Sequence, residues 1–185
     1  GEAEANERLC RLLGPEFRAY RRRWEQVCNC ELLTEFPLFL LVESFYRCNL
    51  RCVHCVQGYK ELREQYAYPD RMSLNLYKAI IEEAAHYHCP SIGLNNINEP
   101  LLLKDLPDRV RYAADHGFLD TMFNTNGVLL TEPTIDRLLD CGLTRLMVSL
   151  DAATKETYDK IRIGSDFHTV MDNVDRFLQR RRTRN

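Results

Sequence analysis

Three cysteines have a spacing that suits a metal centre. Cys48, Cys52 and Cys55 form a C-x₃-C-x₂-C pattern shortly after the apolar run of residues 38–42. Soft thiolates bind zinc and iron–sulfur clusters, and three of them leave one position open in the four-coordinate shell that structural zinc prefers. An iron–sulfur cluster with one ligand-free iron can bind and reduce another molecule. The spacing therefore indicates a metal centre with a free coordination position.

Two other uses of the cysteines remain open at this point. The triplet can hold zinc together with a distant cysteine or histidine, and the eight cysteines of the chain can form disulfides. Disulfides persist in oxidising compartments. The sequence contains no secretory signal pattern and no apolar run long enough to cross a membrane. We therefore expect reduced thiols in a cytoplasmic protein that is not inserted in a membrane.

The charge of the chain does not point to a polyanionic partner. The 185 residues carry a formal net charge of −2, with a pI near 6.2. Basic runs at residues 21–23 and 180–184 are expected to be solvated helix faces, because runs of like charge usually are. We expect no binding of nucleic acid.

The elements that must position the cysteines follow from hydrophobic periodicity. In residues 1–37, Phe17, Tyr20, Trp24 and Val27 recur at three- and four-residue steps, which predicts a helix with one apolar stripe. From residue 38 onward, strand patterns alternate with helix patterns. Ser73 is the candidate cap of one of these helices, and its expected apolar face is Leu76, Ile80, Ile81, Ala84 and Tyr87. We expect a strand buried on both faces at 38–45 and further strands at 91–94, 121–123 and 145–150. This alternation predicts an α/β fold with a parallel sheet.

Polar residues stand where each expected strand ends. Parallel sheets bind their ligands beyond the carboxyl ends of the strands. The residues at these ends, in strand order, are Cys48, then Asn98 and Glu99, then Asn124 and Asn126, and finally Ser149 and Asp151. Their positions predict one shared site, independently of the cysteine spacing.

The cysteine pattern resembles the signature of the radical S-adenosylmethionine (radical SAM) superfamily, C-x₃-C-x-Φ-C. The residue Φ is usually aromatic, and His54 stands there in this chain. The resemblance implies a 4Fe–4S cluster held by Cys48, Cys52 and Cys55, with S-adenosylmethionine chelating the fourth iron near His54. It further implies a reducing electron donor, reductive cleavage of the sulfonium, and a 5′-deoxyadenosyl radical that abstracts a substrate hydrogen.

The segment after the second strand resembles the family's Gly-Gly-Glu-Pro loop. That loop receives the amino group of S-adenosylmethionine, and here Glu99 or exposed backbone carbonyls are implied as the acceptors. Ile97 and Asn98 replace the two glycines, whereas Glu99 and Pro100 are retained. Glycine tolerates positive φ and isoleucine does not, so the backbone conformation of the loop is left open.

Two further segments resemble family motifs. Asn126 lies in a Thr-Asn-Gly turn, where it is first of all a turn residue and is also a candidate ligand residue. The stretch from Ser149 through Asp151 to Arg162 resembles enzymes with a C-terminal SPASM or twitch domain. In them, the matching Ser and Arg contact the ribose and carboxylate of S-adenosylmethionine. The alternative for Arg162 is pairing with a surface acid such as Asp159.

The resemblance also implies an architecture. The family core usually has six strand–helix units, and we count four in this chain. We therefore expect a partial TIM-type (β/α) barrel at 38–185, incomplete at its C-terminus, with an N-terminal helical extension at 1–37. A SPASM or twitch segment, or a partner chain, would then complete the protein.

The expected function is that of a radical SAM enzyme acting on a peptide, a natural product or another small molecule. The sequence assigns no catalytic residue. One alternative is a zinc- or iron-binding scaffold module without radical chemistry, which the altered Ile97–Asn98 pair keeps open. Another is half of a split enzyme that a partner chain completes.

The remaining five cysteines are not expected to bind metal. Cys10, Cys89 and Cys141 are expected to be small buried hydrophobic residues. Cys28 and Cys30 form a C-x-C pair after the first helical segment, and a structural role is favoured over metal binding.

Overall fold

The computed structural model describes residues 2–65 and 71–184. The strands are β1 (Leu40–Leu41), β2 (Ser91–Gly93), β3 (Asp120–Thr125) and β4 (Arg145–Val148). The helices are α1 (Glu2–Leu12), α2 (Gly14–Cys28), α3 (Lys60–Gln65), α4 (Leu74–His86), α5 (Leu106–Asp115), α6 (Glu132–Asp140), α7 (Lys155–Ile161) and α8 (Phe167–Arg184). Two short 3₁₀ turns are η1 (Val56–Gly58) and η2 (Pro100–Leu102).

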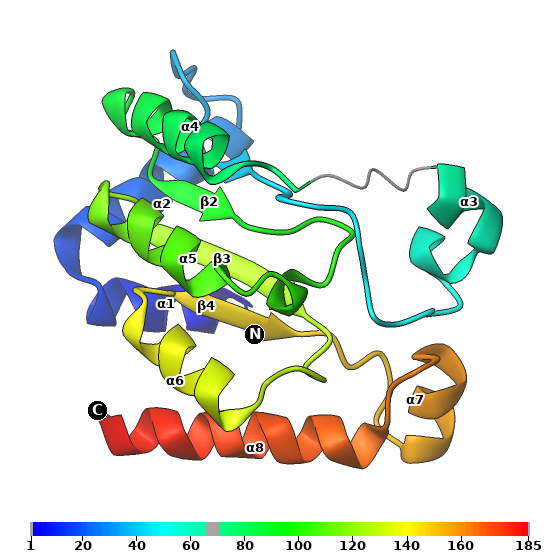
Figure 1. The fold of residues 1–185 in the computed structure, drawn as a ribbon. Coiled ribbons are helices and arrows are strands. Elements are labelled where there is room, and N and C mark those ends of the chain that lie inside the picture. Colours follow the sequence, from blue (N-terminus) through cyan, green and yellow to red (C-terminus); the bar gives the residue numbers. More distant parts are fainter. Residues whose placement is uncertain (1, 66–70, 185) are drawn as a thin grey trace.

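The four strands form one parallel sheet in the order β1-β2-β3-β4 (Figure 1). Ile92 of β2 is in register with Leu40 of β1 and Thr121 of β3, and Phe123 of β3 with Leu146 of β4. Consecutive parallel strands require crossover helices, and α4, α5 and α6 supply them. The predicted α/β fold, a partial (β/α) barrel preceded by helices, is therefore confirmed.

The first strand differs from its prediction. A strand buried on both faces was expected over 38–45, but β1 contains two residues and Leu41 is 53% exposed. The reason is that β1 lies at the edge of the sheet and pairs with β2 alone. β4 is also shorter than expected, because Asp151 adopts a φ of 55° and the chain turns away from the sheet there.

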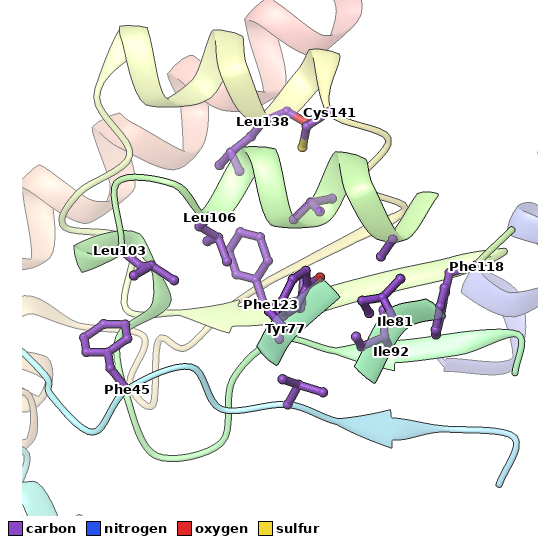
Figure 2. Close-up of a cluster of buried hydrophobic side chains, with 14 of the residues drawn as sticks. Phe45, Tyr77, Ile81, Ile92, Leu103, Leu106, Phe118, Phe123, Leu138 and Cys141 are labelled. Atoms are coloured by element: carbon purple, nitrogen blue, oxygen red, sulfur yellow. The ribbon is translucent and has the colours of Figure 1, made fainter. Parts of the chain in front are cut away.

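The hydrophobic core lies between the sheet and helices α4, α5 and α6. Figure 2 shows Ile92 and Phe123 of the sheet among Tyr77, Ile81 and other side chains of these helices. Ser73 caps α4 as its sequence suggests, since its hydroxyl accepts a hydrogen bond from the Leu76 backbone at 3.1 Å. The apolar face of α4 is rotated from the prediction, however. Leu76 is exposed, and Tyr77 is buried instead because its hydroxyl donates to the Arg109 carbonyl at 2.8 Å.

Helix α2 packs at the amino ends of the strands, where its side chains reach Phe39 before β1 and Asp120 at the start of β3. Phe17 and Tyr20 are buried, and the Trp24 ring meets Phe39 edge-on at 6.2 Å. An added Cβ at Gly93 would lie 2.8 Å from the Phe39 ring, so glycine allows this close approach. The predicted apolar stripe of α2 is thus confirmed, whereas the domain division at residue 37 stays a prediction.

Several remaining expectations can be compared with the structure. Cys89 and Cys141 are buried, as expected. The expectation for Cys10 was wrong, because this residue of α1 is only half-buried. Within the described residues, no helix is long and apolar enough to cross a membrane. In the basic run at the end of α8, Arg180 and Arg184 bind Asp136 at 2.6 and 2.7 Å.

A buried carboxylate ties α2 to the sheet. Asp120 is fully buried and accepts hydrogen bonds from the Thr144 hydroxyl at 2.9 Å and the Tyr20 hydroxyl at 3.3 Å. Arg145 binds it through Nε at 2.9 Å and also through Nη2. A buried charge with several partners is costly to disrupt, because removing one partner leaves the other without compensation.

We predict that Asp120→Ala lowers the free energy of unfolding by about 3 kcal/mol, because it leaves the Arg145 guanidinium without its counter-ion. Chemical denaturation measures this change. Asp108→Ala is the matched control: Asp108 is 69% exposed in its pair with Arg137, so its loss should cost at most about 1 kcal/mol. Equal effects of the two substitutions would show that the Asp120 network is unimportant.

Candidate active site

The three cysteines lie on one loop beyond the carboxyl end of β1. The Cys52 side chain is 5% exposed, Cys48 and Cys55 are half-buried, and all three thiols are free. The loop is tightly turned, since the Cys55 backbone donates to the Cys52 carbonyl at 3.1 Å. Arg51 stabilises it from within by donating to the Cys48 carbonyl at 2.9 Å.

The segment that follows α7 runs beside this loop. The Arg51 backbone donates to the Ile163 carbonyl at 2.8 Å, and the Val53 backbone to the Ile161 carbonyl at 3.1 Å. Figure 1 places α7 at the same end of the sheet as the cysteine loop. The strand-four segment and the cysteines, far apart in sequence, are therefore adjacent.

Gly58 allows the loop to close. Its backbone N–H donates to the Cys55 carbonyl at 2.8 Å. A Cβ at this position would lie 2.4 Å from the carbonyl oxygen of Cys52, and backbone cannot yield as a flexible side chain can. The close approach of Gly58 to Cys52 therefore excludes any larger residue without movement of the loop.

Burial disfavours charge on the thiols. It is the main reason that the pKa of Cys48 and of Cys52 is raised, and the charges of the neighbouring cysteines add to it. Arg162 partly opposes the shift at Cys52. Thiols ligate metals as thiolates, so a bound cationic centre would reverse the preference.

No three His, Cys, Asp or Glu side chains of the described residues gather closely enough to hold a single metal ion. A cluster differs from an ion in this respect, because each thiol binds a separate iron. Three free thiols on one loop therefore fit an iron–sulfur cluster.

Glu99 joins the loop after β2 to the turn after β3. Its side chain is 2% exposed, and Oε1 accepts from the Thr125 hydroxyl at 2.7 Å and from the Leu101 backbone at 3.1 Å. Oε2 accepts from the Asn126 backbone at 2.7 Å. Burial raises the pKa of Glu99, and these hydrogen bonds oppose the rise. Both oxygens are thus used inside the protein.

The replaced glycines do not require positive φ. Among described residues other than glycine, only Cys30, His88 and Asp151 have positive φ, so Ile97 and Asn98 adopt ordinary backbone conformations. Glu43 holds the loop: its Oε1 accepts from the Ile97 backbone at 2.6 Å and from the Asn98 backbone at 2.8 Å.

Asn126 combines a turn role with proximity to the cysteines. Its Oδ1 accepts from the Val128 backbone at 3.0 Å, as expected of a turn residue. Its Nδ2 donates to Oδ1 of Asn49 at 2.8 Å and points to Sγ of Cys48 at 3.9 Å. The turn after β3 therefore contacts the cysteine loop directly.

Arg162 bridges the fourth strand end and the cysteines. Its Nε lies 2.5 Å from Oδ2 of Asp151, and its Nη1 lies 3.8 Å from Sγ of Cys52. His54 approaches the same Asp151 oxygen at 3.5 Å. The alternative prediction that Arg162 pairs with Asp159 was wrong, because Asp159 pairs with Lys155 at 2.6 Å.

The predicted residues are therefore brought to one edge of the sheet. Ser149 also lies there, half-buried, with its backbone donating to the Thr125 carbonyl at 2.9 Å. Sequence reasoning missed Glu43, Asn49 and Gly58. Glu43 could have been noticed as an acid within the strand expected at 38–45; nothing in the sequence alone marked the other two.

Two hollows lie elsewhere. They have volumes of about 430 and 220 Å³ and share Arg23, Leu38 and His88. Leu38 precedes β1 and His88 precedes β2, so these hollows lie at the amino ends of the strands, opposite the cysteines.

Comparisons with known proteins agree with this arrangement. Residues 42–183 match the family model described as the Radical SAM superfamily. A probable GTP 3′,8-cyclase of Methanococcus maripaludis is 32% identical, with 72% of this chain and 43% of the relative covered. Mycofactocin maturase MftC of Mycobacterium tuberculosis is 33% identical, with 71% and 32% covered.

Among solved structures, SuiB of Streptococcus suis in complex with the precursor peptide SuiA is similar with a TM-score of 0.64. It is 17% identical, with 88% of this chain and 35% of SuiB covered, which supports the fold alone. The chain spans less than half the length of these relatives. They include SPASM-type enzymes, as expected, beside a nucleotide cyclase. Because the family model matches the chain from residue 42, directly after β1, to residue 183 in α8, the chain belongs to the radical SAM superfamily.

Proposed function

We propose that this chain forms part of the catalytic core of a radical SAM enzyme, in which Cys48, Cys52 and Cys55 hold a 4Fe–4S cluster. The observation that carries the proposal is the convergence of three free thiols with amide and guanidinium donors at the carboxyl edge of a parallel sheet. When bound, the cluster and S-adenosylmethionine would supply an electron and a carbon radical for hydrogen abstraction.

The protein contributes hydrogen bonds to the cluster ligands. The Leu50 backbone donates to Sγ of Cys48 at 3.4 Å, and Asn126 approaches the same sulfur. Arg162 approaches Sγ of Cys52. Such bonds stabilise thiolates and are one of the means by which a protein sets the reduction potential of a cluster.

Arg162 is also suited to bind the carboxylate of S-adenosylmethionine. Asp151 forms an ion pair with Arg162 at Nε and Cys52 lies near Nη1, so the guanidinium keeps donor capacity for a ligand. Asp151, which His54 also approaches, orients the guanidinium. Ser149 lies at the same strand end for a contact to the ribose. A planar guanidinium held in place loses little freedom on binding.

For the substrate we propose a peptide or a peptide-derived natural product. The support is the likeness to SuiB, solved with a precursor peptide, and to the maturase MftC. The likeness to a GTP cyclase gives a small-molecule substrate as the second candidate. A reducing electron donor and a SPASM- or twitch-like segment or partner chain belong to the same proposal, as does a cytoplasmic location, where thiols stay reduced.

We predict that anaerobic reconstitution yields about four irons with matching sulfide per chain, and that Cys52→Ala reduces both severely. Iron, sulfide and zinc analysis measures this. Cys28→Ala is the control, since Cys28 is an exposed thiol at the end of α2 and should not matter. Full iron in the Cys52 variant, or zinc without sulfide in the parent chain, would contradict the proposal.

A Gly58→Ala substitution should also reduce iron loading, because its Cβ would collide with the Cys52 carbonyl and displace that ligand. The overpacking itself should lower the free energy of unfolding by about 1–3 kcal/mol. Val53→Ala is the control within the loop, because Val53 is 52% exposed. Iron content equal to that of the parent chain would show that the loop tolerates the methyl group.

We predict that Arg162→Lys weakens the binding of S-adenosylmethionine about tenfold or more, because lysine lacks the planar fork. Calorimetric titration of the reconstituted protein measures this. Decarboxylated S-adenosylmethionine should bind both proteins equally, since it lacks the group that Arg162 would contact. Arg176→Lys, at a half-exposed pair with Glu132, is the control. Unchanged affinity in Arg162→Lys would refute the carboxylate assignment.

A further inference from the structure

We propose that the side-chain amide of Asn98, and not the carboxylate of Glu99, receives the α-amino-acid end of S-adenosylmethionine. The inference rests on the proposed function and concerns a position where this chain departs from the glycine of the family pattern. It assigns a ligand-binding role to a side chain that the glycine-containing loop lacks.

Glu99 is already committed within the protein. A carboxylate has about four acceptor positions, and three of them accept hydrogen bonds from Thr125, Leu101 and Asn126. Moving the Glu99 side chain toward a ligand would break these bonds and separate the loop after β2 from the turn after β3. Its negative charge remains nearby, but only about one acceptor position, on Oε2, is left unused.

Asn98 is in the opposite situation. Its side chain is 7% exposed, yet neither Oδ1 nor Nδ2 has a hydrogen-bond partner among the described residues. Buried polar atoms are nearly always paired in folded proteins, so an amide with both ends unpaired requires an explanation. Both residues are buried, and only Asn98 can reorient without losing a hydrogen bond.

The backbone holds Asn98 beside the cysteines. Glu43 accepts from its backbone N–H at 2.8 Å. The next residue, Glu99, donates its backbone N–H to the carbonyl of Arg47, which immediately precedes Cys48, at 2.9 Å. The peptide is therefore fixed on both sides of Asn98, while its side chain is not.

The chemistry of an amide matches an α-amino acid. Oδ1 can accept a hydrogen bond from the ammonium group, and Nδ2 can donate one to the carboxylate. A zwitterion presents these two groups next to each other. A ligand of this kind would pair both unpaired ends of Asn98 at once, while the nearby charge of Glu99 favours the ammonium.

Two neighbouring variants separate this role from a structural one. Asn98→Ala should weaken the binding of S-adenosylmethionine by the reconstituted chain tenfold or more, or about 1.4 kcal/mol. It should not lower the thermal stability of the ligand-free protein, because no hydrogen bond within the described protein is lost. Glu99→Gln should do the reverse and lower the thermal stability more than it weakens binding. It places an amide N–H donor among the Thr125, Leu101 and Asn126 groups that donate to Glu99.

The ligands and a conservative variant complete the test. 5′-Methylthioadenosine lacks the amino-acid end, so the parent chain and Asn98→Ala should bind it equally. Asn98→Asp retains an acceptor and should bind S-adenosylmethionine more tightly than Asn98→Ala. Undiminished binding of S-adenosylmethionine by Asn98→Ala, or a loss of stability as large as that of Glu99→Gln, would overturn the inference. If the reconstituted parent chain binds no S-adenosylmethionine, the proposed function itself is wrong.

Discussion

The arrangement of the candidate site depends on one buried carboxylate. Glu99 accepts hydrogen bonds from Thr125 at the end of β3, from Asn126 in the turn that follows, and from Leu101 after its own strand β2. These bonds fix the turn after β3, and that turn places the Asn126 amide against Asn49 and Cys48. Because charged hydrogen bonds are about twice as strong as neutral ones, this single group can set the relative positions of three strand ends. The retained Glu99 therefore has a structural use in this chain that does not depend on a ligand.

The same reasoning explains how the loop tolerates Ile97 and Asn98. Glycine is needed where φ is positive, and neither of these two positions has a positive φ. Their backbone N–H groups converge on one oxygen of Glu43 instead. A carboxylate at the end of β1 thus fixes the loop that follows β2. Ile97 and Asn98, which replace the two glycines of the family loop, are thus held by Glu43 from a different strand–helix unit.

Much of the fold followed from the sequence, because hydrophobic alternation and cap residues report local structure. The parallel order of strands, the cap at Ser73 and the α2 stripe are examples. The failures share a physical cause: they depend on contacts between distant segments. Leu41 is exposed because β1 is an edge strand, and Tyr77 replaces Leu76 in the core because a carbonyl of α5 accepts from its hydroxyl. The roles of Glu43 and Gly58 likewise arise only when the loops meet.

Arg162 pairs with Asp151 and is also the proposed partner of the carboxylate of S-adenosylmethionine. It is nearly buried, and a buried cation is costly unless it is paired. Asp151 supplies that pairing from a backbone conformation with φ of 55°, which residues other than glycine rarely adopt. Asp is among the residues that adopt it most readily, so charge and backbone requirements select the same side chain. The ion pair with Asp151 keeps the Arg162 guanidinium beside Cys52 independently of any ligand. The guanidinium is therefore held in place before any ligand arrives, and this reduces the entropy that binding would cost.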